Sequence, residues 1–205
     1  FQDLQVNQAS NETAAEFVRS KIRKIVKDPE MARKLSPTNT FGCKRLCVAT
    51  NYYETYNRDN ISLIDLNDTP IKCITANGVR TTKRDYDVDI LILATGFDAM
   101  TGALNRINIQ GTNGQKLTDA WRNGPVSYLG LGVNGFPNMF TITGPGSPSV
   151  LTNMIPTIEQ HVNWIGACLV AMSKKNATRI EAIKSAQSEW VAYNAGLADK
   201  SLRVT

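Results

Sequence analysis

Residues 88–96 read Val-Asp-Ile-Leu-Ile-Leu-Ala-Thr-Gly, and this stretch decides the fold class that the sequence predicts. The run is nearly continuous in apolar side chains, as in a strand that is covered on both faces. Segments with helical spacing of apolar residues follow later in the chain and can cover such a strand. The sequence therefore predicts an α/β protein, because buried strands with covering helices are typical of that class.

Shorter strand-like runs lie on both sides of this stretch. We expect strands at residues 46–49, 61–64, 71–75, 79–82 and 139–143, in addition to residues 88–93. Asn77-Gly78 separates two of these runs and predicts a hairpin with a two-residue turn, since both turn positions need positive φ. Asn113-Gly114 predicts a second turn.

Apolar residues at helical spacing predict three amphipathic helices. The first spans residues 13–27 and begins at a capping box, Thr13-Ala-Ala-Glu16. Short helices are expected from Pro29 through Leu35 and at residues 118–122. The three core-facing stripes are Phe17, Val18, Ile22, Ile25 and Val26; then Ile158, Val162, Ile165, Leu169 and Met172; then Ile183, Ala186, Trp190, Tyr193 and Leu197.

Composition excludes several classes of protein. The 205 residues carry 23 Lys and Arg against 18 Asp and Glu, and because this charge is spread along the chain we expect no nucleic-acid partner. The longest apolar run, residues 165–172, is far shorter than the roughly 20 residues of a membrane span. Four cysteines without CxxC spacing and one histidine indicate reduced thiols, no metal site and a cytoplasmic protein. A start at Phe1 without a signal peptide suggests a piece of a longer polypeptide.

Two glycine-rich motifs each have a functional and an ordinary interpretation. Gly130-Leu-Gly-Val-Asn-Gly135 satisfies the dinucleotide pattern GxGxxG, but a predicted strand follows where a helix is required, so we interpret it as an ordinary loop. Gly144-Pro-Gly-Ser-Pro-Ser149 lacks the GxSxG spacing of a nucleophilic serine. As a turn that enters a helix it is either a plain junction or a source of N–H groups for an electron-rich ligand.

Other candidate residues have an ordinary and a functional interpretation. Lys44-Arg45 is either a solvated strand edge or a pair that recognises phosphate and a developing anion. His161 fits a packing role better than that of a base. The tryptophans are most simply packing residues, namely Trp121, Trp164 and Trp190.

Four motifs together carry a family resemblance. They are Phe41-Gly-Cys-Lys-Arg45, Asn51-Tyr-Tyr-Glu-Thr-Tyr-Asn-Arg-Asp-Asn60, Asp89-Ile-Leu-Ile-Leu-Ala-Thr-Gly-Phe-Asp98 and Gly144-Pro-Gly-Ser-Pro-Ser-Val-Leu-Thr-Asn-Met154. In order and with few gaps, the chain resembles the Baeyer–Villiger monooxygenases of the phenylacetone and cyclohexanone type. Flavin enzymes that oxygenate amines are expected to share only the Ala-Thr-Gly strand end.

The resemblance implies a fold and an activity. It implies parts of two Rossmann-like dinucleotide-binding domains: residues 1–40 end a helical insertion, 41–96 form the second half of an NADPH domain, and 97–205 form the second half of an FAD domain. The family's flavoproteins use FAD and NADPH to insert one oxygen atom of O2 next to a ketone carbonyl, through a C4a-peroxyflavin, giving an ester or lactone. This fragment alone is expected to be inactive without the remainder of its polypeptide. Two alternatives stay open: a non-catalytic module of a flavoprotein, and a related N- or S-oxygenating monooxygenase.

The resemblance also implies residue roles. Arg45 matches the catalytic arginine, whose permanent charge can stabilise an anionic peroxide without donating a proton. Lys44 matches a lysine near the 2′-phosphate of NADPH. The other cofactor-binding positions are Thr95, Gly96, Asn153 and Met154, with Arg45 also among them. The loop that shapes the substrate pocket is matched by Ser149, Val150, Leu151 and Thr152.

Overall fold

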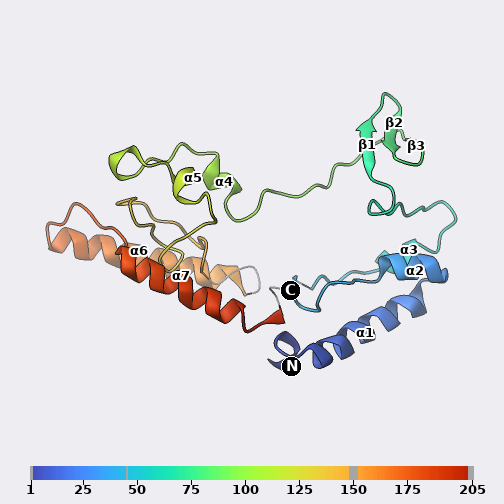
Figure 1. The fold of residues 1–205 in the computed structure, drawn as a ribbon, viewed down its shortest axis with the longest axis horizontal. Coiled ribbons are helices and arrows are strands. Elements are labelled where there is room, and N and C mark those ends of the chain that lie inside the picture. The colour runs from blue at the N-terminus through green and yellow to red at the C-terminus, as the bar shows by residue number, and fades with distance from the viewer. Residues whose placement is uncertain (1, 45, 148–151, 203–205) are drawn as a thin grey trace. The chain divides into compact units, whose positions relative to one another are not determined.

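The computed structural model describes residues 2–44, 46–147 and 152–202 (Figure 1). The chain divides into two compact units, Phe1–Thr95 and Gly96–Thr205. The expected boundary between residues 96 and 97 lies one residue from this division. The further division expected at residue 40 does not separate compact units, since both sides of it belong to the first unit.

The first unit begins with helices. A 3-10 turn, η1 (Gln2–Gln5), is followed by α1 (Gln8–Ile25), α2 (Pro29–Leu35) and α3 (Tyr52–Thr55). The expected capping box at Thr13 is wrong, because α1 starts earlier, at Gln8, and its N-cap is Asn7, whose side chain accepts a hydrogen bond from the Ser10 amide. The start of α2 is confirmed, with Pro29 in its first turn after the capping side chain of Asp28.

A small apolar core holds α1 and α2 together. It consists of Ile22, Val26 and Ala32, all nearly inaccessible to solvent. Phe17, expected in the same stripe, is 63% exposed, so that part of the prediction is wrong. The stripe that α1 buries runs instead through Asn11, Ala15 and Ile22, and a polar residue takes the first of these positions.

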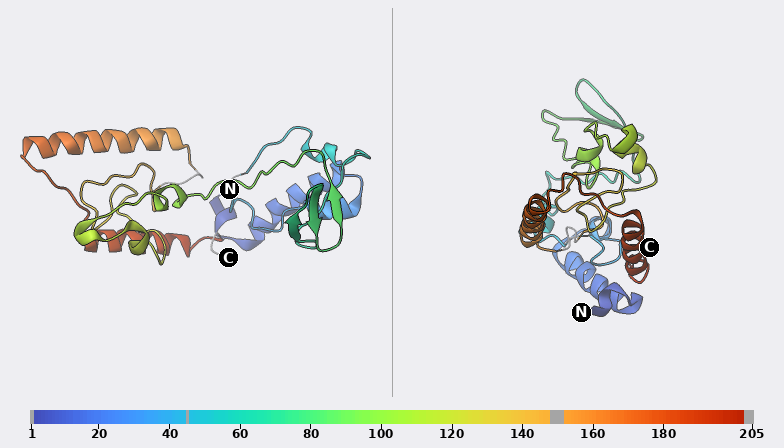
Figure 2. Two further views of the ribbon diagram at one scale, coloured as in Figure 1. Left: turned by 90° about the horizontal axis from the view of Figure 1, so that it is seen from above. Right: turned by 90° about the vertical axis from the view of Figure 1, so that its left-hand side faces the viewer.

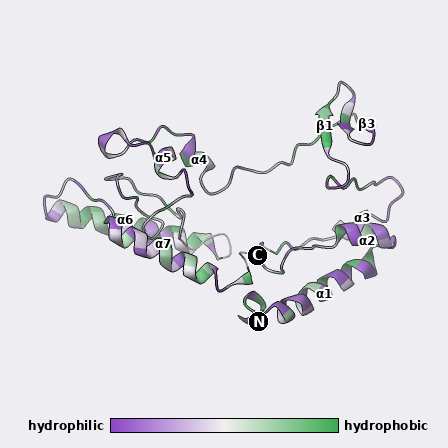
Figure 3. Ribbon diagram, in the orientation of Figure 1, coloured by the Kyte–Doolittle hydropathy of each residue, from purple (hydrophilic) through white to green (hydrophobic). Residues whose placement is uncertain are grey.

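An antiparallel three-stranded sheet follows in the order β1 (Ile71–Ile74), β2 (Gly78–Thr81) and β3 (Asp85–Asp87). The hairpin predicted around Asn77-Gly78 forms. Its two-residue turn does not, because residues 75–77 connect the strands and the φ angle of Asn77 is not positive. Figure 3 shows β1 as a hydrophobic strand (green), and all four of its residues are exposed.

Four of the six expected strands are absent from the described part of the chain. Residues 46–49, 61–64, 88–93 and 139–143 form no strand. A strand exists only through hydrogen bonds to a neighbouring strand, and no other described segment pairs with these four. In two of these segments the apolar side chains lie in solvent, since Val48 is 99% and Ile92 is 82% exposed, whereas Ile61, Leu63, Met139 and Phe140 are half-buried. The described residues form both helices and strands, which is consistent with the α/β prediction.

The second unit contains α4 (Gly102–Asn105), the 3-10 turn η2 (Thr112–Gly114), α5 (Leu117–Ala120), α6 (Met154–Lys174) and α7 (Lys184–Ala198). In Figure 2, α6 and α7 lie on opposite sides of the irregular segment that precedes them. The turn predicted at Asn113-Gly114 is confirmed, with φ angles of 58° and 73°. The short helix predicted at residues 118–122 is present as α5.

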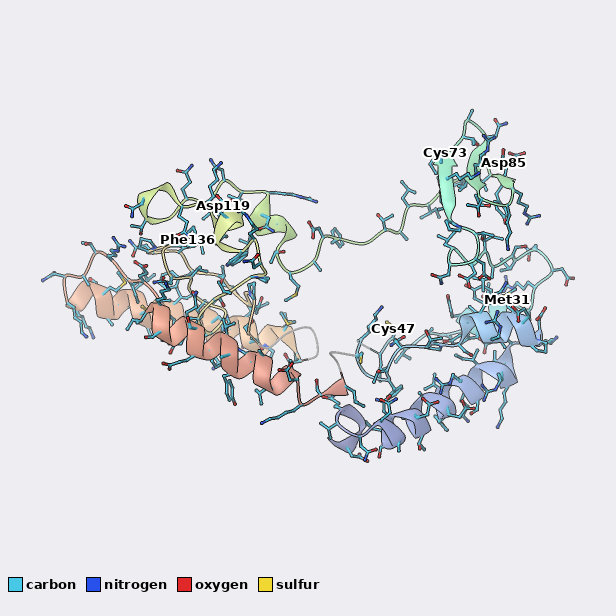
Figure 4. All side chains as sticks on the ribbon, viewed as in Figure 1. Met31, Cys47, Cys73, Asp85, Asp119 and Phe136 are labelled. Atoms are coloured by element: carbon cyan, nitrogen blue, oxygen red, sulfur yellow. The ribbon has the colours of Figure 1, made fainter. Side chains whose placement is uncertain are left out.

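The core of the second unit lies in this irregular segment. It is formed by Leu117, Trp121, Val133 and Phe136, the last labelled in Figure 4. The Trp121 indole donates to the Val126 carbonyl at 2.9 Å, which satisfies its one polar atom. Trp121 is therefore a packing residue, as predicted.

The stripes predicted on α6 and α7 are only partly correct. On α6, Ile158, Ile165 and Met172 are half-buried, but Val162 and Leu169 are about half exposed, and the buried residues are Thr157 and His161. On α7, Ala186 and Trp190 are half-buried, whereas the other three stripe residues are exposed, namely Ile183, Tyr193 and Leu197. Both helices carry apolar residues on more than one face, so spacing alone did not identify the packed face. No helix in the described ranges has the length and apolarity to cross a membrane.

Candidate functional site

The predicted site residues belong to both units. Lys44 and Thr95 lie in the first unit, and Gly96 with residues 152–154 lies in the second. Arg45, together with Ser149, Val150 and Leu151, lies outside the described residues.

A buried asparagine anchors the chain just before Lys44. Asn11 on α1 is 1% exposed, and its side chain forms two hydrogen bonds with the backbone of Phe41: Oδ1 accepts from the amide at 2.9 Å and Nδ2 donates to the carbonyl at 2.8 Å. Nδ2 also donates to the Leu4 carbonyl at 2.7 Å. Sequence patterns did not indicate this residue. Because both donor hydrogens and the oxygen of the Asn11 amide are bonded to backbone, α1 fixes the start of the motif at residues 41–45.

Lys44 itself is exposed, and Gly42 before it has a φ of 80°. This φ lies in the left-handed region, where glycine meets no steric penalty. The exposure of Lys44 agrees with the first interpretation, a solvated position, but the strand expected after it at residues 46–49 does not form. An exposed ammonium group after a fixed turn suits a phosphate contact, because a lysine acts as a point charge on a flexible stem.

The motif at residues 51–60 packs on the end of α1. The side chain of Asn57 bonds to the backbone at the C-terminal end of α1. Its Nδ2 donates to the Ile25 carbonyl at 2.8 Å, and its Oδ1 accepts from the Lys27 amide at 2.8 Å. In the same motif, a hydrogen bond from the Tyr56 hydroxyl to that of Tyr52 raises the pKa of Tyr56 to about 12. These contacts give the motif a structural role in this unit.

Thr95 and Gly96 are exposed and lie on either side of the division between the units. Gly96 has a φ of 76°, which explains why glycine stands there. A Cβ at Gly96 would meet no atom of the described residues within 4 Å. The absence of a Cβ leaves this backbone uncovered by its own side chain.

The turn that leads toward α6 is the most tightly held part of the candidate site. The Gly144 amide and the Thr141 hydroxyl both donate to the Gly130 carbonyl, at 3.1 and 2.8 Å. A Cβ at Gly144 would lie 2.4 Å from Thr141 Oγ1 and 2.7 Å from that carbonyl oxygen. Gly130 thus belongs to a loop that supports this turn, and no helix follows it, which confirms its interpretation as a loop.

Side chains from three other places also bond to the turn. Ser127 donates to the Pro145 carbonyl at 2.5 Å, and the Trp190 indole on α7 donates to the Gly146 carbonyl at 3.0 Å. His161 on α6 accepts from the Thr143 amide at 3.0 Å through Nδ1. The prediction that Trp190 is only a packing residue missed this polar contact. Nothing in the local pattern could have indicated it, since the partner lies 44 residues away.

At the start of α6, Asn153 is an N-cap residue. Its Oδ1 accepts from the Ile155 amide at 3.1 Å, which satisfies a donor that the helix leaves free. Met154 is half-buried, and Thr152 is exposed. The first turn of a helix presents N–H groups and the positive end of its dipole, which favours an electron-rich ligand group.

Titratable groups give this site little acid–base capacity. His161 is 6% exposed, and burial lowers its pKa from the ordinary value of 6.5. Its Nδ1 bonds to the Thr143 amide, so this nitrogen is not placed to accept a proton from a serine of the described residues. Among the residues that the structure describes, no group of His, Cys, Asp and Glu side chains could hold a metal ion.

No protein-family model matches the chain. Cyclohexanone 1,2-monooxygenase from Acinetobacter sp. is 42% identical over 98% of this chain and 37% of its own length. A Baeyer–Villiger monooxygenase from Pseudooceanicola batsensis is 40% identical over 98% of the chain and 37% of its length. A crystal structure of OTEMO in complex with FAD and NADP superimposes with a TM-score of 0.97 at 42% identity, over 100% of this chain and 38% of that one.

The chain is homologous to the Baeyer–Villiger monooxygenases. It spans a little over a third of the length of these relatives. A phenazine N-monooxygenase from Lysobacter antibioticus is also similar, at 43% identity over 94% of the chain and 35% of its own length. The expectation that nitrogen-oxygenating flavin enzymes share only the Ala-Thr-Gly strand end is therefore wrong.

Proposed function

We propose that this chain is part of an oxidoreductase that uses FAD, NADPH and O2 to insert one oxygen atom next to a ketone carbonyl, giving an ester or lactone. The observation that carries the proposal is its identity of 40–42% to two ketone-type monooxygenases over 98% of its residues. The likeness to a structure that holds FAD and NADP supports the choice of cofactors. The two units then correspond to parts of the NADPH and FAD domains, which are Rossmann-like in the intact protein.

The described residues fit the two cofactors. Lys44 offers an exposed ammonium group for the 2′-phosphate of NADPH, and the backbone at Thr95 and Gly96 has room for a close ligand. Asn153 and Met154, in the first turn of α6, would lie beside the flavin, where helix N–H groups favour an electron-rich ring. When bound, NADPH supplies the hydride and FAD supplies the redox centre that reacts with O2.

Arg45 would be the catalytic residue of this chain. A guanidinium stays protonated at any pH at which proteins are stable, so it can stabilise negative charge on oxygen without giving that oxygen a proton. A fixed positive charge lowers the activation free energy of a reaction when it faces the atom on which negative charge develops in the transition state. The residues at 149–152 would shape the pocket for the ketone.

The test is Arg45→Ala in the full-length protein that carries this chain. Flavin reduction by NADPH should stay near the wild-type rate, and ester formation should fall by about a hundredfold or more, as when one group of an oxyanion hole is removed. Arg58→Ala, a change at an exposed arginine in the next motif, is the matched control and should leave both rates unchanged. Unchanged ester formation by Arg45→Ala would remove the catalytic role of Arg45.

A second reaction, oxygen transfer to nitrogen, is favoured by the similarity to the phenazine N-monooxygenase. The two reactions differ in the charge that the oxygen carries, because a ketone is attacked by a nucleophilic oxygen and an amine by an electrophilic one. Parallel assays with cyclohexanone and with phenazine separate them. A lactone without an N-oxide supports the proposal, and an N-oxide without a lactone contradicts it.

A further inference from the structure

The only histidine of the chain, His161, is a buried titratable residue that the proposed reaction does not use. It lies on the second turn of α6. Its Nδ1 accepts a hydrogen bond from the Thr143 backbone amide at 3.0 Å. An imidazole nitrogen that accepts from an N–H group carries no proton itself, so this contact selects the neutral ring with its proton on Nε2.

The donor, Thr143, has an unusual backbone. Its φ of 52° lies in the left-handed region, where a β-branched residue is rarely found unless its surroundings hold it there. The amide points to a side chain of the next helix instead of a backbone carbonyl. The imidazole therefore replaces the hydrogen-bond partner that regular structure would have supplied.

The contact connects two parts of the candidate site. On one side, Thr143 begins the turn whose next residues, Gly144, Pro145 and Gly146, are bonded to Gly130, Ser127 and Trp190. On the other side, His161 lies seven residues after Met154, the first residue of α6. Among the described side chains that bond to this turn, His161 comes from α6, the helix that follows the turn in the chain, whereas Trp190 comes from α7 and Ser127 from the preceding loop.

We propose that neutral His161 is a positioning residue that fixes the turn at residues 143–147 against α6. It thereby sets the place of the helix start at Asn153 and Met154, and the effect of that placement on flavin binding rests on the proposed function. The side chain touches no reacting atom. Its role is to hold two backbone segments in one arrangement.

The surroundings favour a neutral imidazole. Residues 139–147 contain no ionisable side chain, and the ionisable residues of α6 other than His161 are Glu159, Cys168 and Lys174. Glu159 is exposed. Burial lowers the pKa of His161, and no charged neighbour opposes that effect.

The test compares two substitutions in the full-length protein. Asn places Oδ1 about where Nδ1 lies and can accept from the Thr143 amide, whereas Leu has similar bulk and no acceptor. His161→Leu should speed hydrogen exchange of the amides at residues 143–147 by about tenfold or more, since a part-buried donor loses its partner. His161→Asn should restore most of the protection.

The comparison of His161→Leu with His161→Asn distinguishes a positioning role of His161 from an effect on the stability of α6. Leu is the better helix former and the more apolar side chain, so a structural effect alone would rank Leu above Asn. Equal exchange in both variants, or slower exchange in His161→Leu, would overturn the proposal. In the wild-type protein, nitrogen NMR of the imidazole should show an unprotonated Nδ1 at neutral pH, and a protonated Nδ1 would overturn it independently of any variant.

The effect of His161 on flavin binding is tested by a separate measurement. Titration with FAD should show weaker binding by His161→Leu and recovery by His161→Asn, and equal affinity in the two variants would overturn the step from the turn to the flavin. A wild-type protein that binds no FAD would contradict the proposed function itself. The exchange and NMR results would still decide whether His161 positions the turn.

Discussion

At the scale of single residues, the polar side chains buried in each unit do the positioning. Asn11 in the first unit and His161 in the second are both nearly inaccessible, and each bonds to backbone in a segment far along the chain. Buried polar groups that bond to backbone fix a local conformation, because an unpaired group in the same place is unfavourable. Neither residue belongs to a motif that sequence reasoning assigned to the site.

Asn11→Asp tests the first of these anchors. Asp keeps the shape and the acceptor but cannot donate to the carbonyls of Phe41 and Leu4, and it places a charge in a buried position. We expect a loss of about 2 kcal/mol or more in the unfolding free energy, measured by denaturant titration. Asn60→Asp, at an exposed asparagine of the same unit, should change it by less than about 0.5 kcal/mol. Equal losses would show that the three hydrogen bonds contribute little.

His161 also makes stability depend on pH. Because burial lowers its pKa in the folded state, the unfolded chain binds the proton more readily. The stability that neutral His161 contributes is therefore fully present above about pH 6.5, the ordinary value, and is lost as pH falls through the lower folded pKa. Thermal unfolding from pH 7.5 to 5 should show this fall, and His161→Asn should reduce it. A wild-type slope equal to that of His161→Asn would contradict the assignment.

At the scale of elements, the turn before α6 depends on close backbone packing. Gly144→Ala would bring a Cβ within 3 Å of the Gly130 carbonyl oxygen, which is backbone and cannot turn aside. We expect a loss of about 2 kcal/mol or more in unfolding free energy. Gly166→Ala in the middle of α6 meets nothing within 4 Å and should instead stabilise by about 0.5–1 kcal/mol, because alanine is the better helix former. Calorimetry of both variants checks the prediction, and equal shifts would contradict it.

The elements predicted correctly are those that local sequence decides. Pro29 after Asp28 starts α2, and Asn113-Gly114 forms its turn, because the capping side chain and the two positive φ angles are properties of those residues. Residues 88–93 fail because a strand needs a partner, and no described segment provides one. Sequence motifs indicated the residues of the candidate site. They did not indicate the side chains that hold those residues in place, because Ser127, His161 and Trp190 contact backbone that lies 18 to 44 residues away in the chain.

At the scale of the whole molecule, the chain corresponds to only part of its relatives. It covers a little over a third of the length of its relatives, and it exposes apolar residues that globular proteins normally cover, including Ile90, Ile92 and Phe97. Residues 88–93 form no strand, and their exposed apolar side chains leave a surface that a neighbouring segment would normally cover. The proposed activity therefore belongs to the full-length protein.

The most direct test is isotopic. The full-length protein is incubated with FAD, NADPH, cyclohexanone and oxygen gas labelled with the heavy isotope, and the product is analysed by mass spectrometry. We expect a lactone that contains one labelled oxygen atom per molecule, because one atom of O2 enters next to the carbonyl. Consumption of NADPH with no labelled ester or lactone from any of a range of ketones would contradict it.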